Sequence, residues 1–145
     1  MATTTPLIFL GFEINRIVFE KPPLFIEGEF KLDVQHVTHV SNENKNDFAC
    51  DFIITISNVE NKFNLQVQAF SHFKIEGEVT EIVYKNYTTV NAPAIAYPYL
   101  RAFISNMVIQ TGMKAIILPP LNFTVLPKEE SKEEESKEED KNTSE

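Results

Sequence analysis

The sequence has few of the residues on which several chemistries depend. Only four of its 145 residues are glycines, and it has no glycine-rich phosphate loop. Cys50 is the single cysteine, which excludes an internal disulfide and favours a reducing compartment. No apolar run approaches the ~20 residues of a membrane-spanning helix, and no basic region precedes the first apolar run as in a signal peptide. We therefore expect a cytoplasmic protein that does not insert into membranes.

Histidine is also scarce, and its spacing does not indicate a metal site. His36 and His39 are three residues apart on a predicted strand, which places them on opposite faces, and His72 stands alone. No nucleophile is paired with a base, and Cys50 falls in the apolar register of its strand, where we expect it to be buried and inert. We predict a protein that is not an enzyme and binds no metal or cofactor.

The chain has fewer basic than acidic residues. It contains 13 Lys and Arg and 21 Asp and Glu, and its net charge is −8. Residues 128–145 contain nine acids and four lysines, which leaves a net charge of −3 for residues 1–127. No basic patch is present to neutralise phosphates, so we do not expect nucleic-acid binding. We predict one folded domain over residues 1–127 and a disordered Glu/Lys-rich tail over residues 128–145, because such a composition cannot bury a core.

Four segments show the alternation that indicates β-strands, and they cover residues 7–20, 29–40, 48–59 and 63–75. Polar turns between them predict an antiparallel meander, with the four strands paired in order. One face of the sheet is expected to be apolar and the other largely polar. Arg16 falls in the apolar register of the first strand, so we expect its guanidinium to reach an edge or a partner. The alternation also slips at His36, where we predict a bulge.

Residues 95–110 have helical periodicity but lack a broad polar face. Two neighbouring lines of apolar residues follow spacings of three and four: Tyr99, Phe103 and Met107 on one, and Tyr97, Leu100, Ile104 and Val108 on the other. A helix that is apolar over most of its circumference needs cover on two sides. In a chain of this size, a second subunit is the simplest source of that cover.

The ends of this helix have recognisable signals. We expect Asn91 to be the N-cap and Gly112 to end the helix, whereas Pro98 should delay its proper start to about Tyr97 or kink it. Residues 113–120 follow as an apolar run with a double proline, which fits either a short buried strand or an exposed apolar loop. Four strands followed by one long helix predict an α+β domain, with the helix on the apolar face of the sheet.

In this arrangement the chain resembles SecB, the bacterial protein-export chaperone family. Residues 12–17, FEINRI, are similar to the opening strand of the family, and Phe19, Glu20 and Pro22 to the end of that strand. Residues 97–101, YPYLR, resemble the Phe-Pro-Tyr-Ala-Arg start of the family's long helix. Residues 118–123, LPPLNF, resemble its Leu-Ala-Pro-Val-Asn-Phe turn. The match covers nearly the whole of the predicted domain.

The resemblance implies a four-stranded antiparallel sheet with a long helix packed on it. It also implies a homotetramer, built as a dimer of dimers with the helices between the sheets. The implied function is that of an ATP-independent holdase that binds unfolded polypeptides, including preproteins for export, in apolar grooves. Clients would bind to exposed aromatic and aliphatic side chains, for which the candidates are Phe19, Phe30, Tyr97, Tyr99, Met113, Ile117, Leu118, Leu121 and Phe123. The alternative for each of these residues is the core or a subunit interface.

The oligomer interface is expected on the first strand and on the helix. Its candidates are Phe12, Ile14, Leu100, Phe103, Ile104, Met107 and Val108. Glu13, Glu20 and Asp51 are candidates for an acidic face that docks the translocation motor SecA, or else are ordinary solvated residues of the sheet. Gln66 stands where a family glutamate aligns, and the family's second helix and SecA-binding tail have no counterpart after Phe123. Because of these departures, two kinds of partner remain open: SecA, or a dedicated partner such as an antitoxin.

A third function belongs to a different class. The crevice between sheet and helix could bind a small ligand instead of a polypeptide. Binding to many unrelated unfolded chains would indicate a holdase, one tight protein partner would indicate a dedicated adaptor, and a saturable small ligand would indicate the third function.

Overall fold

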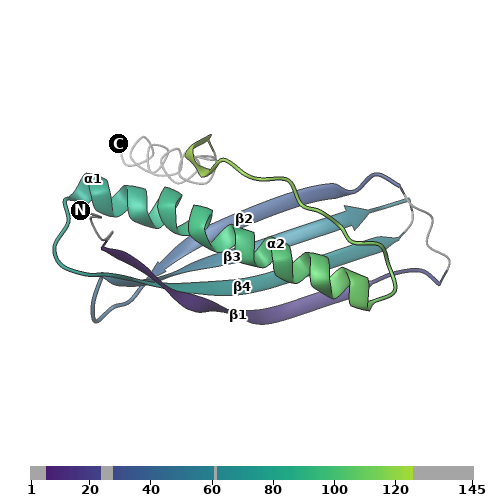
Figure 1. The fold of residues 1–145 in the computed structure, drawn as a ribbon, viewed down its shortest axis with the longest axis horizontal. Coiled ribbons are helices and arrows are strands. Elements are labelled where there is room, and N and C mark those ends of the chain that lie inside the picture. The colour runs from purple at the N-terminus through teal and green to yellow at the C-terminus, as the bar shows by residue number, and fades with distance from the viewer. Residues whose placement is uncertain (1–5, 24–27, 61, 126–145) are drawn as a thin grey trace, which may run out of the picture.

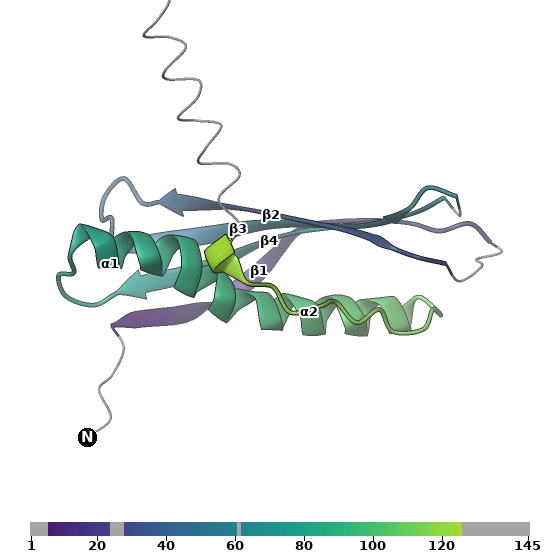
Figure 2. The same ribbon diagram turned by 90° about the horizontal axis from the view of Figure 1, so that it is seen from above.

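The computed structural model describes residues 6–23, 28–60 and 62–125. The predicted tail over residues 128–145 lies outside the described residues. Four antiparallel strands form one sheet: β1 (Leu7–Glu20), β2 (Lys31–Val40), β3 (Asp47–Asn58) and β4 (Phe63–Ile75). A helical layer lies on one side of this sheet (Figures 1 and 2). The predicted α+β architecture is therefore confirmed.

The strand order is β1-β4-β3-β2, so the prediction that all four strands pair in order was wrong for β1. The strand pairs with β4 instead of β2, and β1 and β2 are the two edges. Tight polar turns join β2 to β3 and β3 to β4, but residues 21–30 separate β1 from β2 and include Pro22 and Pro23. Ten extended residues reach across the roughly 14 Å between the edges of a four-stranded sheet, so this connection did not require adjacent strands.

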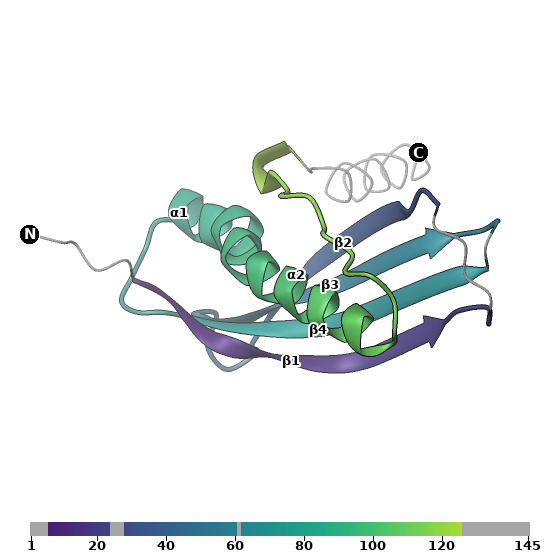
Figure 3. The same ribbon diagram turned by 45° about the vertical axis from the view of Figure 1, so that its right-hand side comes forward.

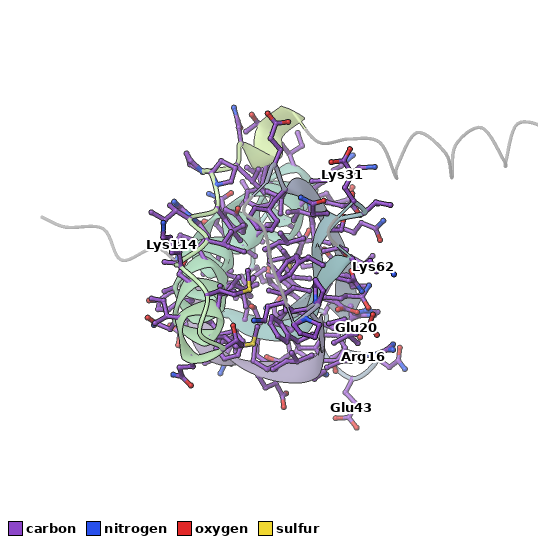
Figure 4. The ribbon with its side chains drawn as sticks, turned by 90° about the vertical axis from the view of Figure 1, so that its right-hand side faces the viewer. Arg16, Glu20, Lys31, Glu43, Lys62 and Lys114 are labelled. Carbon is purple, nitrogen blue, oxygen red and sulfur yellow. The ribbon has the colours of Figure 1, made fainter. Side chains whose placement is uncertain are left out.

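Two bulges in β1 explain its irregular pattern. The pairing with β4 shifts between Phe9 and Gly11, and again between Ile14 and Arg16. Each extra residue reverses the alternation, and six apolar side chains therefore lie opposite buried residues of β4: Leu7, Phe9, Phe12, Ile14, Ile17 and Phe19. Arg16 pairs with Gln68 on the other face, so the prediction that it lies in the apolar register was wrong. In Figure 4 Arg16 and Glu20 lie on the side away from the helix, and Lys114 lies on the helix side.

Gly11 is the residue at which the first bulge depends on glycine. Its φ is +119°, a conformation that side chains with a Cβ rarely adopt, although no atom lies within 4 Å of the position a Cβ would take. We expect Gly11→Ala to lower the free energy of unfolding by about 1–3 kcal/mol through backbone strain alone. Urea unfolding monitored by circular dichroism measures this change. Asn15→Ala, at the second bulge, is the matched control. An equal loss in the free energy of unfolding in both variants would contradict the role of the positive φ at Gly11.

The predicted bulge at His36 was wrong, because β2 pairs with β3 without a shift from Lys31 to Val40. His36 and Thr38 point to the same face as Leu32 and Val34, towards the helical layer. The His36 ring contacts the rings of Phe52 and Phe123 at 5.8 and 5.4 Å, and the Thr38 hydroxyl donates to the Thr88 carbonyl at 3.1 Å. These partners allow polar residues to occupy apolar positions of the pattern.

The helix is longer than predicted, because helical structure continues from Glu81 to Gln110. It comprises α1 (Glu81–Asn86), the π-helical turn η1 (Tyr87–Asn91) and α2 (Ala92–Gln110). Thr80 is the N-cap and accepts a hydrogen bond from the Val83 N–H, so the predictions of a start near Tyr97 and of Asn91 as the cap were wrong. In η1 the Ala92 N–H bonds to the carbonyl five residues earlier, and this altered pairing directly precedes Pro93, which has no N–H to donate. Gly112, with φ +89°, follows the end of α2 as predicted.

The core lies between the sheet and the helical layer. Alternate residues of β3 and β4 are buried from Phe48 to Ile75, and they face the Ala96, Leu100, Ile104 and Val108 side of α2. After Gly112 the chain returns beside α2 as an extended segment over β3 and β2, which we call the strap (Met113–Leu121) (Figures 1 and 3). It ends at the short helix η2 (Phe123–Val125). Within the described residues, no helix is both long and apolar enough to cross a membrane.

Candidate functional site

The strap covers an aromatic cluster next to α2. Phe123 contacts the rings of His36, Phe52 and Tyr97 at centroid distances of 5.4, 6.1 and 5.8 Å. Tyr97, Leu118 and Phe123 are only 2, 3 and 6% exposed. The prediction that these three residues line an open groove is therefore corrected: they lie in the core, because the strap folds back onto the helix and sheet.

Two hydroxyl groups hold the strap in place. The Ser105 Oγ donates to the Ile116 carbonyl at 2.7 Å, and the Tyr97 hydroxyl donates to the Pro119 carbonyl at 2.8 Å. Burial raises the pKa of Tyr97, against the opposing effect of the Arg101 guanidinium, which lies 5.9 Å from the ring centroid. The tyrosine therefore remains a hydrogen-bond donor well into the alkaline range.

A second aromatic group lies where β1 ends and β2 begins. Phe19 and Phe30 both contact the Phe63 ring edge-on, at centroid distances of 5.9 and 5.2 Å. Phe19 and Phe30 are partly buried, and so are Met113 and Leu121 at the two ends of the strap. Ile117, in contrast, is 81% exposed. Of the nine predicted groove residues, six therefore present surface: Phe19, Phe30, Tyr99, Met113, Ile117 and Leu121.

A separate apolar surface forms where the helix meets β1, and we call it the β1–helix strip (Phe12, Ile14, Ile17, Ile95, Tyr99 and Phe103). Tyr99 contacts Phe9 and Phe12 at ring distances of 4.9 and 6.2 Å. Ile17, Ile95 and Tyr99 remain 46, 37 and 50% exposed. No charged residue lies on this side of the helix, which presents positions 95, 99, 102, 103 and 106. An uncharged, partly exposed surface of this kind is suited to contact with another protein.

The predicted interface residues divide into two groups. Phe12, Ile14, Phe103 and Met107 are partly buried and contribute to the surface or border it. Leu100, Ile104 and Val108 are fully buried within the single chain, so their assignment to an interface is corrected to the core. The sequence reasoning missed Ile17 and Ile95. The 2-3-2-3-2 spacing of the apolar residues in β1 was the available signal for Ile17, and the four-residue spacing to Tyr99 was the signal for Ile95.

The outer face of the sheet carries the predicted acidic residues. Glu13, Glu20 and Asp51 do share this face, but two of them bond to histidines that had not been assigned a role. His72 Nε2 lies 2.6 Å from Glu13 Oε1, and His39 Nε2 lies 3.2 Å from Asp51 Oδ2. The Gln68 amide also donates to Asp51. The acidic face is therefore partly engaged in its own hydrogen bonds.

One hollow in the structure has a volume of about 330 Å³, and its lining includes His39, Ala49 and His72 of the outer face. It does not lie in the crevice between sheet and helix, where the small-ligand alternative had placed a site, because side chains there are packed together. Among the described residues, no group of three or more His, Cys, Asp or Glu side chains could hold a metal ion.

Cys50 lies in the core, with no exposed surface. Burial, with a smaller contribution from Asp51, raises its pKa to about 12. We expect a disulfide reagent such as DTNB to leave Cys50 unmodified in the folded protein at pH 8 and to modify it in urea. Because folding favours the neutral thiol, its contribution to stability is complete below about pH 9 and is lost as the pH rises towards 12. Rapid labelling of the folded protein would contradict this account.

These features define a class of protein: a four-stranded sheet covered on one side by a helix and a strap, with apolar surface beside both. The chain matches the family described as preprotein translocase subunit SecB over residues 17–134, which is most of its length. It therefore belongs to the SecB family, and the resemblance seen in the sequence is confirmed.

Individual proteins are similar to the chain, and the first of them shows the same fold. The SecB-like chaperone Rv1957 of Mycobacterium tuberculosis, solved in complex with a ChAD peptide from the Rv1956 HigA1 antitoxin, has a TM-score of 0.65 at 14% identity, over 81% of this chain and 88% of that one. A Streptococcus agalactiae protein of unknown function has a TM-score of 0.47 at 11% identity, over 81% and 99% of the two chains. The uncharacterized protein MJ0357 of Methanocaldococcus jannaschii is 33% identical over 72 residues, 48% of this chain. That match spans only 46% of MJ0357.

Proposed function

We propose that this SecB family member is a cytoplasmic, ATP-independent chaperone that binds unfolded polypeptides, among them preproteins awaiting export. The observation that carries the proposal is the apolar surface on the helical side of the sheet, in a chain whose family is defined by chaperones. Unfolded chains expose aliphatic and aromatic side chains, and burying each of these side chains contributes about 1.5–3 kcal/mol. The complementary surface is supplied by the exposed Ile117 and by four partly buried residues, Phe19, Phe30, Met113 and Leu121, whereas Tyr99 belongs to the β1–helix strip.

Assembly would multiply these contacts. We propose that a second copy of the chain covers the β1–helix strip and that pairs of such dimers form a homotetramer. The strip is uncharged, partly exposed and continuous with the core, as expected of a surface that is buried in an oligomer. Several weak client sites on one tetramer would bind a long unfolded chain much more tightly than one site does.

A partner-dedicated form of the same chaperone is the second candidate. The solved structure of Rv1957 contains a peptide from an antitoxin, and this chain shares the fold of that protein. The outer face also differs from a simple acidic surface, because Glu13 and Asp51 are paired with His72 and His39. This pairing argues against SecA as the principal partner and in favour of a specific polypeptide.

A binding survey separates the two candidates. Several unrelated polypeptides, reduced and alkylated so that they remain unfolded, are titrated against the protein in the absence of ATP. A general chaperone binds most of them with dissociation constants within about tenfold, whereas a dedicated chaperone binds one of them far more tightly. Folded forms of the same polypeptides are the control. Equal binding of folded and unfolded forms, or binding of neither, would overturn the proposed function.

A further inference from the structure

The strap has the chemical character of a bound unfolded chain. None of the described backbone–backbone hydrogen bonds outside helices and strands involves residues 113–121. The strap is held instead by hydroxyl groups of α2 that donate to its carbonyls, from Ser105 to Ile116 and from Tyr97 to Pro119. Any extended polypeptide offers the same carbonyl groups, so this mode of attachment is independent of sequence.

The side chains of the strap alternate as they do in an extended segment. Leu118 is 3% exposed and packs in the core, whereas the preceding residue, Ile117, is 81% exposed. Ile116 is partly buried against the core. Leu118 belongs to the same buried core as the aromatic cluster of Phe52, Tyr97 and Phe123, and the His36 ring packs against Phe52 and Phe123. Leu118 is therefore the most deeply buried attachment of the strap, beside the two bonded carbonyls and the partly buried Met113, Ile116 and Leu121.

We propose that the strap occupies, in the free protein, the surface that receives clients, and that an extended segment of an unfolded polypeptide displaces it. This inference rests on the proposed chaperone function and names its binding surface. An apolar client side chain would take the place of Leu118, and the Tyr97 and Ser105 hydroxyls would donate to client carbonyls. The strap thereby keeps this apolar surface covered when no client is present, which limits aggregation of the chaperone itself.

The test compares two substitutions. Leu118→Ser removes the side chain that seats the strap, and the matched control Ile82→Ser changes a residue of similar size on α1 that is 77% exposed and lies outside the proposed client surface. The probe is reduced and alkylated ribonuclease A, with binding measured by fluorescence anisotropy. A displaced strap leaves a larger fraction of the protein ready to bind, so we expect Leu118→Ser to lower the dissociation constant about tenfold and Ile82→Ser to leave it unchanged.

A second measurement on the unmodified protein avoids any effect of the substitution on folding. The ¹⁵N heteronuclear Overhauser effect of the strap amides, Met113 to Leu118 and Leu121, is followed with and without the same probe. We expect the probe to lower this value in the strap, because a displaced segment moves more freely, while the value in β3 stays constant. A higher value in the strap would mean that it closes over the client, and would overturn the inference.

The hydroxyl groups are tested in the Leu118→Ser background. Adding Tyr97→Phe keeps the ring but removes the donor, and we expect client affinity to fall about two- to tenfold, the contribution of one hydrogen bond. Unchanged affinity would overturn the role of this hydroxyl. If the original protein binds the probe but Leu118→Ser binds it no more tightly, only the strap inference fails. If the original protein and all variants fail to bind it, the proposed function fails, and the inference fails with it.

Discussion

Replacing Leu100 with alanine is expected to lower the free energy of unfolding by about 2–5 kcal/mol, the largest effect on stability that we predict for a single truncation. Leu100 has no exposed surface and faces the sheet from the middle of α2, between Tyr97 and Ile104. Truncation removes buried methyl groups and leaves a cavity that the close-packed layers cannot fill. Urea unfolding monitored by circular dichroism gives the change.

A control variant and the dependence on protein concentration show whether the loss of stability in Leu100→Ala comes from the core of the single chain. Ile109→Ala removes a side chain from the same helix that is 53% exposed, and should change stability by no more than about 0.5 kcal/mol. Because Leu100 lies in the core of the single chain, its effect should be present at every protein concentration. A loss of stability confined to low concentration would instead place Leu100 at a subunit interface, as the helical periodicity alone had suggested.

Introducing a charge into the β1–helix strip is expected to have the largest effect on assembly. Phe103→Glu places a carboxylate on an uncharged surface that we propose to be buried between two copies. An unpaired charge at a buried interface costs several kcal/mol, enough to convert the oligomer to single chains at micromolar concentration. Light scattering measures the mass, and circular dichroism confirms that the variant stays folded.

Two further variants make this result specific. Phe103 also packs against the core, so Ile95→Glu, at a residue that is 37% exposed, tests the same strip with less effect on folding. Val59→Glu introduces the same charge at the exposed turn between β3 and β4, where Val59 is 89% exposed, and should leave the mass unchanged. An oligomer that survives both strip substitutions would show that another surface holds the subunits together.

The sequence pattern predicted local structure better than long-range pairing. The clean alternation of β3 and β4 located the core correctly, because every second residue from Phe48 to Ile56 and from Phe63 to Ile75 is buried beneath the helical layer. The position of β1 could not be predicted in the same way, because a ten-residue connection permits either edge of the sheet. Its two bulges hid the register, since each one reverses the alternation.

The candidate site was only partly predictable for a different reason. Helical periodicity identifies two apolar lines on α2, but cannot say which of them the sheet covers. In the structure the Leu100 line is buried and the Tyr99 line remains partly exposed. Likewise, the composition of residues 113–118 fits both a buried strand and an exposed loop, and the strap combines the two: Leu118 is buried while Ile117 is exposed. The folding back of this segment depends on the Ser105 and Tyr97 hydroxyls, which no local pattern indicates.

The central claim is that this SecB family member assembles and holds unfolded chains. Its most direct test is the mass in solution by light scattering, measured for the protein alone and after addition of reduced and alkylated ribonuclease A. We predict a mass of four 16.6 kDa chains that increases when the unfolded client is added and does not change when folded ribonuclease A is added. A mass of one chain, with no complex at any client concentration, would contradict both the assembly and the chaperone function.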